Sequence, residues 1–306
     1  MVGSHRATRG GRLCPGATHP HPGRSTSRSR STPRGGTHPG IATVRDRVVQ
    51  AALLTVLEPI FEADFQPCSY GFRPKRRAHD AIAETHFLAS RSYEWVVEGD
   101  IEACFDNISH SALLDRVRVR VGDKRVLGLV KAFLKAGVLT EGGAERDTVT
   151  GCPQGGIVSP LLANIALSVL DDHFAGAWNA MGDSHKRAER RRRGLANYRL
   201  IRYADDWLLI VAGTRADAER LREEAAAVLS PMGLCLSATK TRITHIDKGL
   251  EFLGFRVQRH TQRGSAKRYV YTYPTRAAFA AVKGKVRALT RGATNQSLDI
   301  LLHRLN

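Results

Sequence analysis

The most constraining feature of this sequence is a pair of adjacent acids with strand-forming residues on both sides. The segment is NYRLIRYADDWLLIV, in which Asp205 and Asp206 follow Tyr203 and Ala204. The apolar runs before and after the acids predict a β-hairpin with the acids at its tip. Adjacent carboxylates repel each other unless a cation lies near them. Mg²⁺, which prefers oxygen ligands, fits this residue type, although ordinary turns also contain Asp pairs.

Another acid stands at the end of a second expected strand, well upstream. Trp95–Val97 predicts a short apolar strand that ends at Gly99 and Asp100, and a helix is expected to begin near Ser109. If Asp100 lies opposite the acidic hairpin, the acids supply two sides of a two-metal site for phosphoryl displacement. The alternative for Asp100 is a turn or helix-capping residue. Asp106 is expected to order the turn before the helix.

A glycine-rich loop and a helix start lie between the two acidic segments. Ser159 and Pro160 combine a capping hydroxyl with proline at the first helical position, which predicts a helix there. The loop before it, Pro153–Gly156, allows close backbone approach to a ligand, and Gln154 can both donate and accept hydrogen bonds. The alternative is a plain Gly-Gly turn.

Six segments carry a family resemblance: CSYGFRPKRRAHDAI, VVEGDIEACFDNI, GCPQGGIVSPLLANI, YRLIRYADD, LSATKT and EFLGF. In this order they resemble the reverse transcriptase domain of group II intron-encoded proteins, from near Gly40 to near Phe255. Such proteins copy RNA into DNA with dNTPs, and many help their own intron RNA to fold and splice. The resemblance implies an RNA-directed DNA polymerase of a mobile element, a nucleotidyltransferase with RNA template, DNA primer, dNTPs and intron RNA as partners, and with a maturase role left open.

The resemblance also implies roles for individual residues. Asp100, Asp205 and Asp206 would be the catalytic acids and would ligate two Mg²⁺ ions, with Mn²⁺ as a substitute. The residues expected at the dNTP are Arg73, Phe105, Gln154 and Lys240. Those expected at the template and primer are Gly155, Gly156, Phe252, Leu253 and Gly254.

These roles have a physical basis, and several of them have an alternative. The guanidinium of Arg73 can grip phosphate oxygens through two donors. Phe105 would exclude a 2′-hydroxyl and so select dNTP, or would simply be a core residue. Lys240 would donate to the departing pyrophosphate, or would be an ordinary surface lysine. The segment Phe252–Phe255 would grip the primer, or would form a plain edge strand around Gly254.

Composition agrees with a nucleic-acid partner. The formal net charge is +18, from 47 Lys and Arg against 29 Asp and Glu, which favours polyphosphate binding that weakens with salt. The densest basic run, Lys186–Arg193, is expected to be a mobile surface insertion that meets RNA backbone or is merely solvated. Five cysteines without metal-type spacing favour free thiols in the cytoplasm. No apolar stretch approaches membrane-spanning length, and no protein partner can be inferred.

The chain is expected to have three parts. Residues 1–40 read as a disordered basic tail or, by composition, as a transit peptide. Residues 41–255 would form the fingers–palm domain, beginning with a helix that stops at Pro59. Residues 256–306 would begin the thumb or maturase connection, with a basic helix after Pro274, and would be truncated. We therefore hypothesise that the chain is a fragment from a disrupted intron gene.

The fold class predicted is α+β: a right-hand polymerase palm with partial fingers, an antiparallel sheet backed by helices, and a thumb that is largely absent. The backing helices are expected to follow Ser109, Ser159 and Arg215, the last ending at Pro231–Gly233.

Three functions compete: an intron-type reverse transcriptase, a catalytically inactive RNA-binding remnant, and another palm-type polymerase, such as a retron-like or defence-associated reverse transcriptase or an RNA-dependent RNA polymerase. Phe105 speaks against RNA synthesis.

Overall fold

The computed structural model describes residues 43–135, 138–139, 145–146, 150–153 and 155–291. The chain divides into two units, each built from segments that are distant in sequence. The first comprises Met1–Ile60, Glu102–Ala166 and Ala225–Cys235, and the second comprises Phe61–Ile101, Leu167–Glu224 and Leu236–Asn306. The expected basic tail over residues 1–40 lies outside the described residues.

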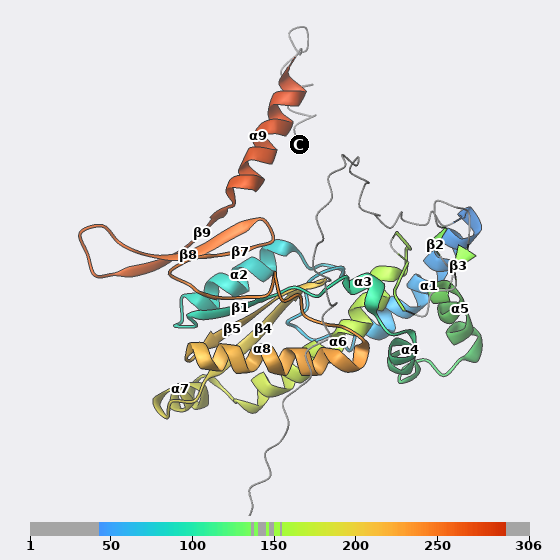
Figure 1. The fold of residues 1–306 in the computed structure, drawn as a ribbon, viewed down its shortest axis with the longest axis horizontal. Coiled ribbons are helices and arrows are strands. Elements are labelled where there is room, and N and C mark those ends of the chain that lie inside the picture. Colours follow the sequence, from blue (N-terminus) through green and yellow to red (C-terminus); the bar gives the residue numbers. More distant parts are fainter. Residues whose placement is uncertain (1–42, 136–137, 140–144, 147–149, 154, 292–306) are drawn as a thin grey trace, which may run out of the picture. The chain divides into compact units, whose positions relative to one another are not determined.

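The second unit is built on an antiparallel sheet (Figure 1). Its strands are β1 (Trp95–Gly99), β4 (Asn197–Tyr203), β5 (Asp206–Ala212) and β6 (Arg242–His245), in the order β4-β5-β1-β6. β4 and β5 form the predicted hairpin, in which Tyr203 lies opposite Asp206 across a two-residue turn. β5 also pairs with β1. The hairpin is therefore confirmed, and the two central strands are β1, which ends just before Asp100, and β5, which begins at Asp206.

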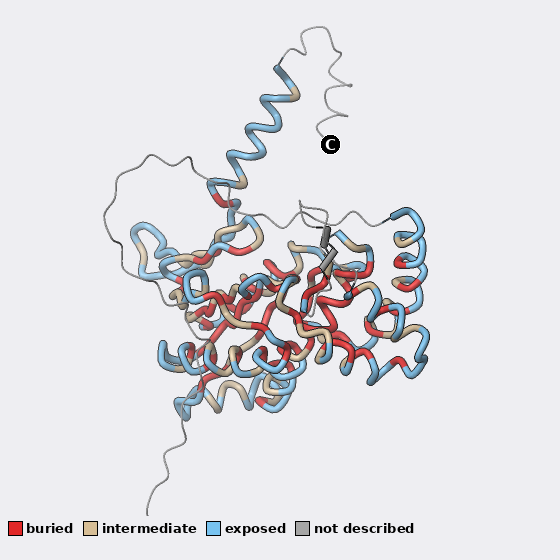
Figure 2. Tube along the Cα trace, turned by 45° about the vertical axis from the view of Figure 1, so that its right-hand side comes forward, coloured by how far each residue is buried: buried red, intermediate tan, exposed pale blue. Residues whose placement is uncertain are grey.

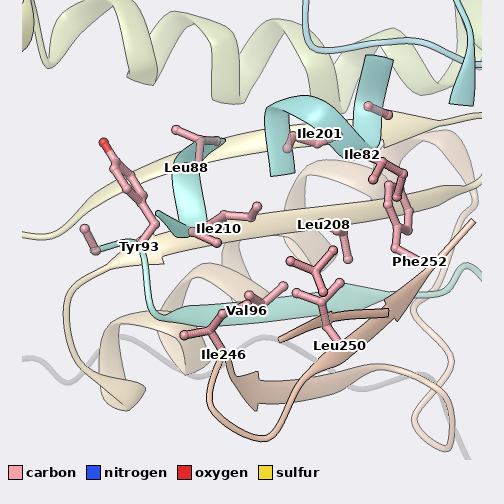
Figure 3. Packing of buried hydrophobic residues seen from close by; sticks show 14 residues of the cluster. Ile82, Leu88, Tyr93, Val96, Ile201, Leu208, Ile210, Ile246, Leu250 and Phe252 are labelled. Carbon is pink, nitrogen blue, oxygen red and sulfur yellow. The ribbon is translucent and has the colours of Figure 1, made fainter. Parts of the chain in front are cut away.

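Helix α2 (Ala78–Ala89) covers one face of this sheet. The buried cluster beneath it combines side chains of α2, of alternate strand positions and of β7 (Leu250–Phe252), as Figure 3 shows: Ile82, Leu88, Val96, Ile201, Leu208, Ile210, Leu250 and Phe252. The intervening residues of β5, which are Trp207, Leu209 and Val211, are buried as well. Because both faces of β5 are covered, its sequence is an unbroken apolar run and does not alternate with polar residues.

The opposite face is covered by α6 (Ser159–Ala180) and α8 (Arg215–Leu229). Phe174 of α6 packs edge-on against Tyr198 of β4, with the ring centroids 6.0 Å apart. His173 of α6 pairs with Glu224 of α8 at 2.7 Å. The predicted starts of these two helices are confirmed. After α8, a short 3₁₀ helix (Ser230–Met232) ends at Gly233, whose φ is +78°.

A second sheet follows in the same unit. It consists of β7, β8 (Phe255–Thr261) and β9 (Arg268–Pro274) in sequential antiparallel order. Helix α9 (Arg276–Thr290) begins after Thr275, whose side chain accepts a hydrogen bond from the Ala278 amide. The predicted basic helix is thus confirmed, and α9 has no buried residue, so it is coloured almost wholly as exposed in Figure 2.

The basic run expected as a mobile insertion is instead helical, in α7 (Ser184–Arg192). Asp183 caps this helix by accepting a hydrogen bond from the Lys186 amide at 2.9 Å. Arg187 lies over the Trp178 ring, 4.3 Å from its centroid, and Arg190 donates to Asn197 Oδ1 and to a main-chain carbonyl. The cap and these contacts order a segment that charge alone would leave irregular.

The first unit is mainly helical. Besides most of α1 (Val44–Glu62), it contains α3 (Cys104–Asn107), α4 (His110–Arg118), α5 (Lys124–Lys135) and the short strands β2 (Val138–Leu139) and β3 (Glu145–Arg146). Ser109 caps α4 by accepting a hydrogen bond from the Ala112 amide, which confirms the helix start expected there.

Helix α1 (Val44–Glu62) does not stop at Pro59, as the sequence analysis expected, but contains it. Pro59 has no N–H to donate to the Thr55 carbonyl, so the helix loses one hydrogen bond. The turn that follows Pro59 places Phe61 in the core, where it is 5 % exposed. Burial of that ring offsets the lost bond, because a buried phenyl group contributes about 1.5–3 kcal/mol.

The structure tests the expectation that the cysteines are free thiols. Cys68, Cys104 and Cys152 are free and buried, as expected, whereas Cys235 is disulfide-bonded and the free-thiol prediction is wrong for it. Disulfide formation depends on Cα distances that sequence spacing does not fix.

Among the helices that the structure describes, none combines the length and apolar character required to cross a membrane.

Candidate active site

The end of β1 and the β4–β5 turn bring three carboxylates to the same end of the sheet. Gly99 lies opposite Trp207 in the β1–β5 ladder, so the register places Asp100 opposite Asp206 where β1 ends. Asp205 occupies the turn immediately before Asp206. A Cβ atom on Gly99 would lie 2.0 Å from the Trp207 ring. The site therefore needs glycine before its first acid.

A buried arginine holds the turn that carries Asp205. Arg202 donates from Nη1 to the Ala204 carbonyl at 2.8 Å, from Nε and Nη2 to the Asp171 carboxylate at 2.7 and 2.5 Å, and from Nη2 to Ser69 Oγ at 2.7 Å. Both side chains of the Arg202–Asp171 pair are 0 % exposed. Ala204 has a φ of +57°, a conformation that costs a residue with a Cβ about 1–2 kcal/mol. Arg202 thus stabilises a turn whose positive φ is unfavourable for the alanine at that position.

A neighbouring loop supports the same turn. The Tyr70 amide donates to the Arg202 carbonyl at 2.8 Å, and a Cβ atom on Gly71 would lie 2.2 Å from the Ala204 nitrogen. The Tyr70 hydroxyl donates to Glu84 of α2, and burial followed by this hydrogen bond raises the pKa of Tyr70. The glycine of the SYGF segment is therefore a packing requirement of the acidic turn.

The electrostatics of the site disfavour its full ionisation. Asp206 exposes more than a third of its surface, yet desolvation raises the pKa of its carboxyl group above the ordinary value, and the charges of Asp205 and Asp100 raise it further. The Lys240 ammonium acts in the opposite direction. A cation among the three acids would relieve this repulsion.

One carboxylate oxygen of Asp100 has no hydrogen-bond donor. Its Oδ2 atom is buried and accepts no hydrogen bond. Lys240 Nζ lies 3.3 Å from that oxygen, close enough for an ion pair but without hydrogen-bond geometry. A buried carboxylate oxygen without a donor is costly, so a cation with oxygen ligands fits this donor set.

The acids do not form a closed ligand set as they stand. Within the described ranges, no group of three or more His, Cys, Asp and Glu side chains is arranged to hold a metal ion. Asp100 and Asp206 directly follow and precede the last β1–β5 ladder pair, Gly99 and Trp207, and Asp205 is in the β4–β5 turn.

The contacts of Arg73 in the structure differ from the triphosphate contact expected for it. Its Nε and Nη2 donate to Glu62 at 2.9 and 2.7 Å, and its Nη1 donates to the carbonyls of Gln66 and Ser69 at 2.7 and 2.9 Å. The side chain is buried, and its donors are already occupied. Arg73 therefore fastens the end of α1 to the following loop, and a triphosphate contact is not supported by its surroundings.

Four residues expected at the dNTP or the template belong to the first unit, whereas the acids belong to the second. Gln154 lies outside the described residues. Gly155 is exposed, with a φ of +89°, and a Cβ atom on Gly156 would lie 2.5 Å from Ser159 Oγ. The Ser159 hydroxyl donates to the Pro153 carbonyl at 2.7 Å. The loop is thus a tight turn against the start of α6, in which the positive φ of residue 155 favours glycine and Gly156 is packed against Ser159. Phe105, in α3, is partly buried.

The segment expected to grip a primer forms the turn between β7 and β8. Leu253 and Gly254 occupy it with φ values of +49° and +80°, between the paired residues Phe252 and Phe255. Phe252 is buried in the core, so only the turn is available for a ligand. The Gly254 carbonyl accepts a hydrogen bond from the Thr275 amide at 2.9 Å, which ties the turn to the start of α9.

Sequence reasoning missed Arg202 and Asp171. The signal for Arg202 was present, because a charged residue interrupts a strand whose neighbours are apolar, and such a charge must have a buried partner. Its partner on α6 could not be chosen from several acids without the tertiary structure.

Comparison with known proteins identifies the family. Residues 28–257 match the family model described as reverse transcriptase (RNA-dependent DNA polymerase). The chain is 39 % identical to protein YkfC of Escherichia coli strain K12, covering 79 % of this chain and 69 % of that protein. It is 32 % identical to the group II intron-encoded protein LtrA of Lactococcus lactis subsp. cremoris, covering 75 % of this chain and 45 % of that protein.

A solved structure supports the fold alone. The structure of apo telomerase from Candida tropicalis matches with a TM-score of 0.51 and 12 % identity, over 85 % of this chain and 48 % of that one.

The chain belongs to the reverse transcriptase family, and within it to the group II intron type. The predicted family and the α+β palm-type fold are confirmed.

The Arg202–Asp171 pair makes a testable prediction. Arg202→Met should lower the free energy of unfolding by about 3–5 kcal/mol, because the Asp171 carboxylate is left buried without its partner. Adding Asp171→Leu should recover most of this loss, because neither charge then remains. The double variant still lacks a donor for the Ala204 carbonyl, so its catalytic activity should stay below wild type. Urea unfolding and activity assays test both statements; a single variant as stable as wild type would contradict the first.

The raised pKa of Asp206 makes a second prediction. Below the ordinary carboxyl range near pH 4 the group is neutral in both the folded and unfolded states. Above that range the unfolded chain ionises freely while the folded chain resists, so the native acid destabilises the fold. In chelator-treated protein at neutral pH, Asp206→Asn should therefore raise the melting temperature, by no more than about 2 °C for so accessible a group. Thermal scans should show the gain vanish at acidic pH; a gain that persists there would exclude ionisation as its cause.

Proposed function

We propose that this chain catalyses RNA-directed DNA synthesis, in which nucleotides pass from dNTPs to a primer 3′-hydroxyl. The observation that carries the proposal is the β1–β5 register, which sets Asp100 opposite Asp206 beside the turn with Asp205. Family membership supplies the reaction class. Since the chain spans 45 % of LtrA, the whole protein's activity and its intron RNA partner, with any maturase role, are part of the proposal.

Reverse transcriptases are generally dependent on divalent metals, and we assign the metal-binding role to Asp100, Asp205 and Asp206. The buried, donor-free oxygen of Asp100 and the raised pKa of Asp206 support this assignment. Bound Mg²⁺, or Mn²⁺ in its place, would lower the pKa of the primer hydroxyl and offset the triphosphate charge.

The chain's own residues would position the reactants. Lys240 has a side chain that is 70 % exposed and rests beside Asp100, so it can move from that carboxylate to the departing pyrophosphate. We retain Phe105 as the residue that excludes a 2′-hydroxyl, and Gln154, Gly155 and Gly156 as contacts of the nascent base pair and template. The β7–β8 turn at Leu253 and Gly254 would contact the primer backbone. Arg73 has no place in this proposal.

A second function is favoured by one observation, the formal net charge of +18. A chain with this charge can bind RNA through its phosphates without copying it. In that case, RNA binding would be tight and salt-sensitive, and the three acids would be dispensable for everything the chain does.

The deciding experiment is dNTP incorporation on an RNA template–DNA primer duplex with Mg²⁺. We expect incorporation by the wild type and a loss on the order of a thousandfold in Asp205→Ala/Asp206→Ala, because metal stabilisation of the transition state contributes several kcal/mol. Asp115→Ala, which removes an exposed acid of α4, is the matched control and should retain activity. Salt-sensitive RNA binding without incorporation by the wild type would favour the non-catalytic function.

A further inference from the structure

The β8–β9 ribbon has one packed face and one face that carries a row of tyrosines. Side chains alternate along each strand, and the register pairs Arg256 with Tyr273, Gln258 with Tyr271 and His260 with Tyr269. These six residues therefore share one face. The three tyrosines are 38–49 % exposed, an unusual exposure for three successive aromatic residues on one strand face.

The other face fixes how the ribbon is held. Val257 is fully buried, and Thr272 contacts His86 of α2 at 3.0 Å through its hydroxyl. Arg259 pairs with Asp247 at 2.6 Å and with Glu94 beside β1. Because these contacts anchor the packed face, the tyrosine row is presented outward on a fixed support and does not depend on a loop.

The charge around the row is of one sign. Residues 256–274, which form the ribbon, contain five Lys or Arg and no Asp or Glu. The nearby acid Glu251 is already paired with Arg256 at 3.1 Å. At the far end of the ribbon, Arg263 and Lys267 make no ion pair within the part of the chain that is described. A partner that covers the tyrosines must therefore carry negative charge.

The spacing of the rings selects the form of that partner. Alternate residues of a strand are about 6.6–6.8 Å apart, twice the 3.4 Å rise of one strand in a duplex. Rings held at this backbone spacing leave room for one unstacked base between them, whereas paired bases remain stacked on each other. Two of the rings are also held by neighbours on the same face: the Tyr273 hydroxyl donates to Gln258 Oε1 at 3.1 Å, and the His260 and Tyr271 ring centroids are 5.9 Å apart.

We propose that the outer face of the β8–β9 ribbon binds single-stranded nucleic acid, with bases stacked on Tyr269, Tyr271 and Tyr273 and phosphates bound by Arg263 and Lys267. This proposal rests on the proposed function in taking the partner to be a nucleic acid, and it adds a site for unpaired strand outside the acidic centre. Stacking on aromatic rings tolerates any base, so the site holds strands of varied sequence.

The test is binding of a fluorescent single-stranded oligonucleotide to the full chain, measured by anisotropy. Replacing the three tyrosines by isoleucine keeps strand-forming, apolar side chains and should weaken binding by on the order of tenfold per ring. The matching triple phenylalanine variant keeps the rings and should bind within about threefold of wild type. Should the triple isoleucine variant fold poorly, Tyr271→Ile alone should show a single-ring loss.

The outcomes separate cleanly. Uridine and thymidine oligonucleotides report whether the strand is RNA or DNA, and a loss with either supports the site. A blunt RNA–DNA duplex should lose little affinity in the isoleucine variant; an equal loss on duplex would overturn the proposal, as would unchanged single-strand binding. A wild type that binds single strands through these tyrosines yet incorporates no dNTP would refute the polymerase function while leaving this site standing.

Discussion

The candidate site depends on a fully buried ion pair, Arg202–Asp171, beneath the β4–β5 turn. Burying two charges costs several kcal/mol per ion, which their attraction repays only when the geometry is good and further donors and acceptors are satisfied. Here the Arg202 guanidinium donates hydrogen bonds to the Asp171 carboxylate, to the Ser69 hydroxyl and to the Ala204 carbonyl. The same interaction that joins α6 to β4 thus fixes a turn with positive φ, and that turn sets the direction of Asp205.

The rigidity of this support explains how the site tolerates its own repulsion. Three carboxylates lie at one end of the sheet, and burial together with neighbouring charge raises the pKa of Asp206. A flexible loop would let such charges move apart. Here Arg202 donates to the Ala204 carbonyl and Gly71 packs against the Ala204 nitrogen, so the turn cannot move to separate them. Perturbed carboxylates of this kind are typical of functional sites, where stability is lower than the sequence could achieve.

The sequence predicts local features of this protein well and long-range ones poorly. The spacing of apolar residues and the capping residues, which act within a few positions, predict the hairpin, the strand that ends just before Asp100 and the starts of α4, α6 and α8. Arg73 shows the limit: its motif indicates phosphate binding, but Glu62 and two carbonyls take its donors. That outcome depends on how the end of α1 approaches the loop, and α1 itself continues past the proline expected to end it.

The central claim is that Asp100, Asp205 and Asp206 form one divalent-cation site, and ¹⁹F NMR of 5-fluorotryptophan protein titrated with Mn²⁺ tests it most directly. Trp207 adjoins Asp206, whereas Trp95 lies at the other end of β1, opposite Val211. A paramagnetic ion at the acids should broaden the Trp207 resonance first, and Trp95 and Trp178 only at higher concentration. The selective broadening should disappear in Asp205→Asn/Asp206→Asn. Equal broadening of all three tryptophans, or selective broadening that survives the substitutions, would contradict the account.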